Sequence, residues 1–189
     1  MSATTIAVIL QGIADLAPYL AQLGSLAAKS QAGGIVTEND LRLAEVARVR
    51  GWGDDEIVVN LQGDEPLVPP ALLVQLAEQL VNHAEAGIAT MATPIHTLAE
   101  LRSPNAVKAV LRDDGLAHYF SRAPIPFARD ADPDATELPA GVPYLRHLGL
   151  YAYRVSTLRR FVALAPHAHE RAEQLEQLRP LAAGIGIHV

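Results

Sequence analysis

The stretch EIVVNLQGDEP, residues 56–66, decides how this chain folds. Its run of β-branched residues, Ile57, Val58 and Val59, predicts a strand over 56–61 that is buried on both faces. Strands of that kind occur in parallel sheets covered by helices. We expect residues 62–66 to form the turn at the C-terminal end of this strand.

The predicted turn carries residues suited to phosphate chemistry. In an open α/β sheet, ligands bind beyond the carboxyl ends of the strands. Asp64 stands where a hard cation that bridges phosphate oxygens would be held, and Gly63 lets the backbone approach a ligand closely. A metal–nucleotide site and a solvated acidic turn both fit this pattern, because Gly-Asp is common in turns.

Helical and strand patterns alternate on both sides of this stretch, and the alternation predicts one α/β sandwich over residues 1–189 with a mostly parallel sheet. Leu43, Val46 and Val49 form the expected apolar face of the second helix. Asp113-Asp114-Gly115 supplies a hairpin turn, and residues 130–143 read as a mobile loop. The predicted helices are 13–28, about 39–50, 71–83, 98–101, 155–164 and 171–183, and the further strands are 88–94, 106–111, 116–121, 144–153 and 185–189.

The amino-acid composition excludes or disfavours several classes of function. A chain of 189 residues with 50% hydrophobic and 19% charged residues can bury one sizeable core. The 15 Lys and Arg residues against 21 Asp and Glu give a formal charge of −6, which disfavours binding to nucleic acid or to anionic membranes. The sequence has no cysteine, so thiolate catalysis and cysteine-based metal sites are excluded. Apolar stretches stop short of the roughly 18 residues that span a bilayer, and we expect a cytoplasmic protein.

Five motifs give the sequence a family resemblance from Arg42 to Val189. In order and spacing they resemble the 3-deoxy-manno-octulosonate cytidylyltransferase (CMP-Kdo synthetase) family. The motifs are QGDEP at 62–66, PNAVK at 104–108, YFSRAPIP at 119–126, LRHLGLYAYR at 145–154 and LEQLR at 175–179.

The resemblance implies a fold and a reaction. The fold would be a three-layer Rossmann-like nucleotidyltransferase sandwich with a mixed, mostly parallel sheet. The reaction would join CTP to the sugar acid Kdo with Mg²⁺, giving CMP-Kdo and pyrophosphate for lipopolysaccharide biosynthesis. The resemblance also implies a homodimer, with residues 155–164 and the preceding strand as its elements.

The resemblance also implies roles for individual residues. Asp64 looks like the catalytic carboxylate that binds Mg²⁺. Arg42, Gln62 and Gly63 look like nucleotide contacts, with Gln62 lying between nucleotide and sugar. We expect the sugar-acid contacts to converge on one cleft, with Asp64 at the carboxyl edge of the sheet. They are Gln62, Arg122, His147, Tyr151, Glu176 and Gln177.

Each candidate contact has a plainer interpretation. His147 fits a hydrogen-bonded core histidine, and Arg122 fits a residue that caps a neighbouring carbonyl or pairs with a surface acid. We expect only one of Tyr151 and Tyr153 to point into the cleft. Glu176 and Gln177 adjoin on a predicted helix, so they should not share one face.

Two departures from the family pattern support a second hypothesis. The family's basic N-terminal loop, which cradles the triphosphate, has no match in residues 1–36, and Lys29 is the single basic residue before Arg42. The family's second metal-binding aspartate, beyond the terminal strand, is also missing. The alternative is therefore a catalytically impaired remnant or divergent paralogue that binds a sugar acid or a partner subunit.

Overall fold

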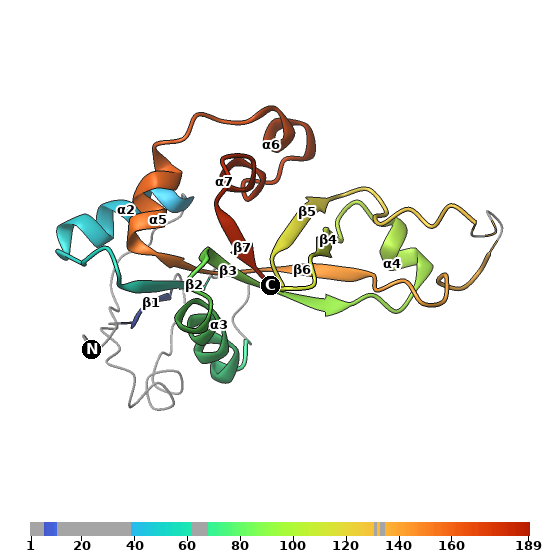
Figure 1. Ribbon diagram of the computed structural model, residues 1–189, viewed down its shortest axis with the longest axis horizontal. Coiled ribbons are helices and arrows are strands. Elements are labelled where there is room, and N and C mark those ends of the chain that lie inside the picture. The colour runs from blue at the N-terminus through green and yellow to red at the C-terminus, as the bar shows by residue number, and fades with distance from the viewer. Residues whose placement is uncertain (1–5, 11–38, 62–67, 131, 133–134) are drawn as a thin grey trace.

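A mixed seven-stranded sheet forms the middle layer of the molecule in this computed structural model (Figure 1). The structure describes residues 6–10, 39–61, 68–130, 132 and 135–189. The strands are β1 (Ile6–Leu10), β2 (Ile57–Leu61), β3 (Ala86–Pro94), β4 (Lys108–Leu111), β5 (Ala117–Ser121), β6 (Leu145–Arg154) and β7 (Gly186–His188). The helices are α2 (Asn39–Val49), α3 (Pro70–Asn82), α4 (Leu98–Arg102), α5 (Val155–Val162), α6 (Ala168–Glu173) and α7 (Leu178–Ala182).

The long strand β6 organises the sheet. The strand order is β1-β2-β6-β3-β7, and the β4–β5 hairpin joins the other end of β6. The predicted mixed α/β sandwich is confirmed, but the expectation of mostly parallel pairing needs correction. Because β6 runs against β2, β3 and β4, the pairings among the described strands are parallel only for β1–β2 and β3–β7. Strands β1, β2, β3 and β7 still run in one direction.

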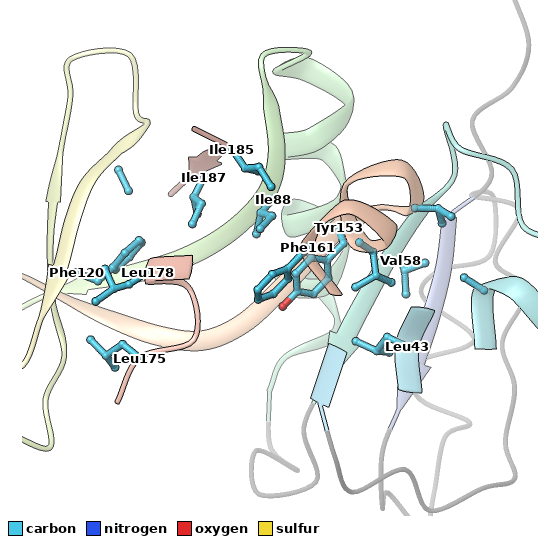
Figure 2. Close-up of a cluster of buried hydrophobic side chains, with 14 of the residues drawn as sticks. Leu43, Val58, Ile88, Phe120, Tyr153, Phe161, Leu175, Leu178, Ile185 and Ile187 are labelled. Carbon is cyan, nitrogen blue, oxygen red and sulfur yellow. The ribbon is translucent and has the colours of Figure 1, made fainter. Parts of the chain in front are cut away.

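Alternate residues of β2 point into two separate cores, as the predicted double burial of this strand requires. Ile57 and Val59 pack against α3, in a cluster with Leu73 and Leu76. Val58 packs on the opposite face, in a cluster that draws on α2, α5 and α7 (Figure 2). The sheet therefore has a helical layer on each face, which is the predicted three-layer arrangement.

Helices α2 and α3 largely match the sequence pattern. Helix α3 begins at Pro70, in the first turn of a helix where the missing N–H of proline costs no hydrogen bond. In α2, Leu43 is buried as expected, but Val49 is 67% exposed and Ala47 takes the buried position. Positions 43 and 47 are four residues apart and so share a helix face, whereas position 49 turns away.

The predicted helix over 171–183 is wrong, because the chain breaks it into α6 and α7. Gln174 adopts a left-handed conformation with φ 51° and ψ 52° and ends α6. An unbroken helix would place Pro180 in its interior, where proline removes a hydrogen bond and clashes with the preceding turn. Restarting the helix at Leu178 puts Pro180 in the first turn instead. Residues 174–177 become a turn between the two helices.

Strands β4 and β5 and helix α4 form an arm at one end of β6 (Figure 1). The predicted hairpin is confirmed, and Gly115 adopts the positive φ of +81° that its turn needs. The described part of 130–143 forms neither helix nor strand. Among the described residues, no helix is long and apolar enough to cross a membrane. The predicted helix 13–28 and turn 62–66 lie outside the described residues.

Candidate functional site

A pocket of about 400 Å³ opens on the face of the sheet that carries α5 and α7. This volume lies within the range of small-molecule sites. Strands β2 and β6 form its floor, and the 174–177 turn forms part of its wall. Its polar lining is Asn60, His147, Tyr151, Tyr153, Gln174, Glu176 and Gln177.

Strand β6 supplies most of the aromatic lining, and Phe161 of α5 supplies the rest. Residues two apart on a strand face the same side, so His147, Tyr151 and Tyr153 all reach the pocket. The rings of Tyr151 and Tyr153 stack with centroids 5.8 Å apart. The expectation that only one of these tyrosines faces the cleft is therefore wrong, because their spacing of two places them together.

His147 is both a hydrogen-bonded histidine and a pocket residue. Its Nε2 lies 2.8 Å from Oγ1 of Thr90, and its ring meets Phe120 edge to face. Burial lowers the pKa of His147 to about 4. The imidazole is therefore neutral near pH 7, where it can hydrogen-bond to a ligand but cannot attract a carboxylate by charge.

Glu176 and Gln177 both line the pocket, which corrects the expectation that they cannot share one face. That expectation assumed a helix at 171–183, whereas these residues belong to the turn before α7. Gln177 is buried and Glu176 is exposed. The turn thus presents an amide and a carboxylate to the same space.

The guanidinium of Arg122 binds backbone carbonyls. Its Nε, Nη1 and Nη2 donate to the carbonyl oxygens of Glu173, Pro104 and Gln174 at 2.7, 2.9 and 3.3 Å. Arg122 is not among the residues that line the pocket, but its Nη2 binds the carbonyl of Gln174, which does line it. The predicted contact of Arg122 with the sugar acid stays a prediction. The plainer interpretation, a cap on neighbouring carbonyls, describes this arginine.

Glu173 and Lys108 complete the network around Arg122. The Glu173 carboxylate accepts hydrogen bonds from Ser121 Oγ at 2.6 Å and from the Arg122 backbone N–H at 2.9 Å. Lys108 is fully buried, and its ammonium donates to the carbonyls of Ser103, Ala106 and Arg122 at 2.8, 2.5 and 2.6 Å. Burial lowers the pKa of Lys108. The network ties β4 and β5 to the end of α6, where the 174–177 turn begins.

Sequence reasoning missed Asn60 and Gln174 as pocket residues. Asn60 is 4% exposed and lines the pocket, and the polar interruption of the apolar run 57–61 was the signal that could have found it. Gln174 reaches the pocket through the helix break, and the signal for that break was Pro180, which would stand in the interior of an unbroken helix over 171–183. Gln62, Gly63 and Asp64 lie outside the described residues, as does the side chain of Arg42.

The described residues do not themselves form a metal centre. Within ranges 6–10, 39–61, 68–130, 132 and 135–189, no three histidine or acidic side chains gather in a way that could hold an ion. The predicted metal ligand, Asp64, is outside those ranges, so its assignment stays a prediction.

Comparison with known proteins gives a consistent result. The cytidylyltransferase family model matches residues 36–187. The 3-deoxy-manno-octulosonate cytidylyltransferases of Pseudomonas syringae pv. syringae (strain B728a) and pv. tomato (strain ATCC BAA-871 / DC3000) are each 54% identical over 149 residues, which is 78% of this chain and 59% of each relative. The chain therefore spans about three fifths of the length of these curated relatives.

A solved structure is similar over almost the whole chain. It is CMP:2-keto-3-deoxy-manno-octonic acid synthetase complexed with CTP, which is 28% identical. The TM-score is 0.76, and the match covers 99% of this chain and 88% of the other.

Proposed function

Because the chain belongs to the cytidylyltransferase family, we propose that it transfers the cytidylyl group of CTP to Kdo. A hydroxyl oxygen of Kdo attacks the α-phosphorus of CTP, the bond to pyrophosphate breaks and the hydroxyl proton is released, giving CMP-Kdo and pyrophosphate. The observation that carries the proposal is the gathering of His147, Tyr151, Glu176 and Gln177 around one pocket. These are four of the residues that the family resemblance assigns to the sugar acid.

The chemistry of this lining suits a polyhydroxylated ligand. A neutral imidazole and a carboxylate both offer acceptors to hydroxyl protons, whereas the tyrosine hydroxyls and the Gln177 amide can donate or accept. Such a set can distinguish the hydroxyl groups of a ligand by where they point and by whether they donate or accept a hydrogen bond. Fixing the sugar hydroxyl beside the phosphorus would also lower the entropic part of the barrier.

The nucleotide end of the proposal depends on residues around β2. We assign Asp64 to Mg²⁺, and Arg42, Gln62 and Gly63 to the nucleotide, on the family resemblance. Asn60, which lines the pocket, lies two residues before Gln62 in the chain. Mg²⁺ held by Asp64 and the phosphates would neutralise charge on the triphosphate.

The test is pyrophosphate release by the purified chain with CTP, Kdo and Mg²⁺. We expect release by the natural sequence and its loss in Asp64→Ala. Asp55→Ala is the matched control, because Asp55 is an exposed acid just before β2. Equal release by Asp64→Ala and the control would contradict the role of Asp64.

A second candidate is a binding protein descended from such an enzyme. The sequence carries a single basic residue, Lys29, before Arg42, which leaves little positive charge there for a triphosphate. This candidate predicts that the chain binds Kdo, or a partner subunit, without releasing pyrophosphate. A Kdo titration run beside the release assay separates the two.

Three wider proposals rest on the family resemblance. We propose that the product serves lipopolysaccharide biosynthesis, that the reaction takes place in the cytoplasm and that the protein is a homodimer. The apolar side chains of α5, Val155, Leu158 and Phe161, are buried within the chain, so a dimer contact at α5 would use its polar face. Light scattering on the purified chain tests the homodimer.

A further inference from the structure

Thr90 of β3 is buried at an irregular step in the sheet. Across this step Thr90 pairs with Tyr151 but Met91 pairs with Leu148, so β6 carries two extra residues, Gly149 and Leu150. The Thr90 hydroxyl lies 2.8 Å from the carbonyl oxygen of Leu150 and 3.1 Å from that of Leu148. The Thr90 hydroxyl therefore lies within hydrogen-bond distance of two carbonyl oxygens at the β-bulge, where the regular hydrogen bonds between β3 and β6 are interrupted.

The same hydroxyl contacts His147, at 2.8 Å from Nε2. A hydroxyl has one proton to donate, and a carbonyl oxygen can only accept. The Thr90 proton is therefore directed to a carbonyl, and the contact with His147 uses a lone pair of Oγ1. It follows that Nε2 carries the proton of the neutral imidazole and that Nδ1 keeps a lone pair.

We propose that Thr90 is a positioning residue that fixes His147 as the Nε2–H tautomer, so that Nδ1 accepts a hydrogen bond from a hydroxyl of the sugar acid. The proposal rests on the proposed function for the identity of the ligand. Because His147 lines the pocket and turns Nε2 toward Thr90, Nδ1 is the ring nitrogen left for a ligand. A carboxylate has no proton to offer Nδ1, so this histidine selects a hydroxyl.

The first test is spectroscopic and needs no activity. Nitrogen-15 NMR of labelled protein distinguishes the two neutral tautomers, and the His147 signals are those that disappear in His147→Gln. We expect the Nε2–H tautomer in the natural sequence and in Thr90→Ser, which keeps the hydroxyl. Thr90→Val keeps the shape but removes the acceptor, and we expect it to shift the tautomer balance toward Nδ1–H.

The second test measures binding of Kdo in the presence of CTP. Thr90→Val should weaken Kdo binding about fivefold, as the loss of one aligned hydrogen bond would, and Thr90→Ser should restore the affinity. His147→Gln keeps an N–H for Thr90 but has no acceptor at the position of Nδ1, so it should also weaken binding. In the His147→Gln background, Thr90→Val should add little.

The outcomes separate this inference from the proposed function. An Nδ1–H tautomer in the natural sequence overturns the inference even if Thr90→Val fails to fold, which thermal melting would reveal. An unchanged tautomer in folded Thr90→Val overturns it as well. If the tautomers behave as expected but no Kdo binds, the role of Thr90 in fixing the tautomer stands, whereas the hydroxyl contact and the proposed function fail.

Discussion

The neutral state of His147 makes stability depend on pH. Burial lowers its pKa from 6.5 to about 4 in the folded chain. As the pH falls below 6.5 the unfolded chain takes up a proton that the folded chain refuses, so the free energy of unfolding decreases. Between pH 6.5 and 4 this residue should cost up to about 3 kcal/mol of stability.

Urea unfolding at pH 7 and pH 4.5 measures this effect. The control is His147→Gln, which cannot titrate but presents an N–H to Thr90. Other groups titrate over the same interval, so the informative quantity is the difference between the two proteins. The natural sequence should lose more stability than the variant on acidification, and parallel losses would contradict the role of His147.

The buried ammonium of Lys108 should contribute measurably to the free energy of unfolding. Its ammonium serves three backbone carbonyls in a fully buried site. Lys108→Met keeps the length of the side chain but leaves those carbonyls without a donor. We expect the free energy of unfolding to fall by roughly 3 kcal/mol, since unsatisfied buried groups are costly.

Chemical unfolding of Lys108→Met beside Arg48→Met tests this expectation. The Arg48 side chain is 73% exposed and pairs with Glu45 at 3.9 Å, so its loss should change stability by less than about 0.5 kcal/mol. Equal, small effects in the two variants would mean that water replaces the ammonium of Lys108.

At the scale of single residues, the sequence predicted which residues line the pocket better than it predicted what each side chain contacts. His147, Tyr151, Glu176 and Gln177 were named from motifs and all line one pocket. Arg122 was named from the same motifs, but its guanidinium lies on carbonyls of residues 104, 173 and 174. These carbonyls are far apart in the sequence, and no local pattern reveals that they surround one arginine.

At the scale of elements, strands and helices with clean apolar periods were predicted well, and the region around Pro180 was not. The apolar spacing of 171–183 indicated one helix, but the proline requirement divides it and creates the 174–177 turn. The turn is also what lets Glu176 and Gln177 share the pocket. Pro180 was a local signal against one unbroken helix, whereas the left-handed conformation of Gln174, which ends α6, has no such signal.

The position of this turn should depend on Arg122. The guanidinium holds the carbonyls of Glu173 and Gln174, directly before the turn begins. Arg122→Met should therefore loosen residues 175–179 and raise the KM for Kdo about tenfold, which is about 1.4 kcal/mol, with a smaller change in kcat. Hydrogen exchange at the amides of Leu178 and Arg179, which donate to Leu175 and Glu176, reports the loosening.

The control for Arg122→Met is Arg112→Met, since Arg112 pairs with Asp114 in the exposed hairpin turn. Only the Arg122 variant should speed exchange in the 174–177 turn and its neighbours. A raised KM with unchanged exchange would instead favour the direct contact between Arg122 and the Kdo carboxylate that the family resemblance implies.

At the scale of the whole molecule, the pocket joins distant parts of the chain. Asn60 comes from β2, His147, Tyr151 and Tyr153 come from β6, Phe161 comes from α5, and part of the wall comes from the turn before α7. The α/β class followed from the alternation of elements, but the insertion of β6 between β2 and β3 did not. The position of β6 depends on pairing between strands that are far apart in the sequence, and the hydrophobic periodicity along the chain carries no information about such pairing.

Because CTP should bind the folded chain and not the unfolded one, it should raise the melting temperature of the whole molecule. At a free CTP concentration of 100 times Kd, linkage gives about 2.7 kcal/mol of stabilisation. For a chain of 189 residues, each kcal/mol corresponds to about 2–4 °C, so we expect a rise of about 5–10 °C. Thermal melting with Mg²⁺ and increasing CTP measures it.

Two comparisons make the CTP experiment specific. UTP carries the same triphosphate charge, so a smaller shift with UTP would mean that the protein recognises the cytosine base. Asp64→Ala should lose most of the CTP shift if this carboxylate holds Mg²⁺ against the phosphates, whereas Asp55→Ala should keep it. An unchanged melting temperature in millimolar CTP would contradict nucleotide binding by this chain. It would therefore also contradict the proposed transfer reaction.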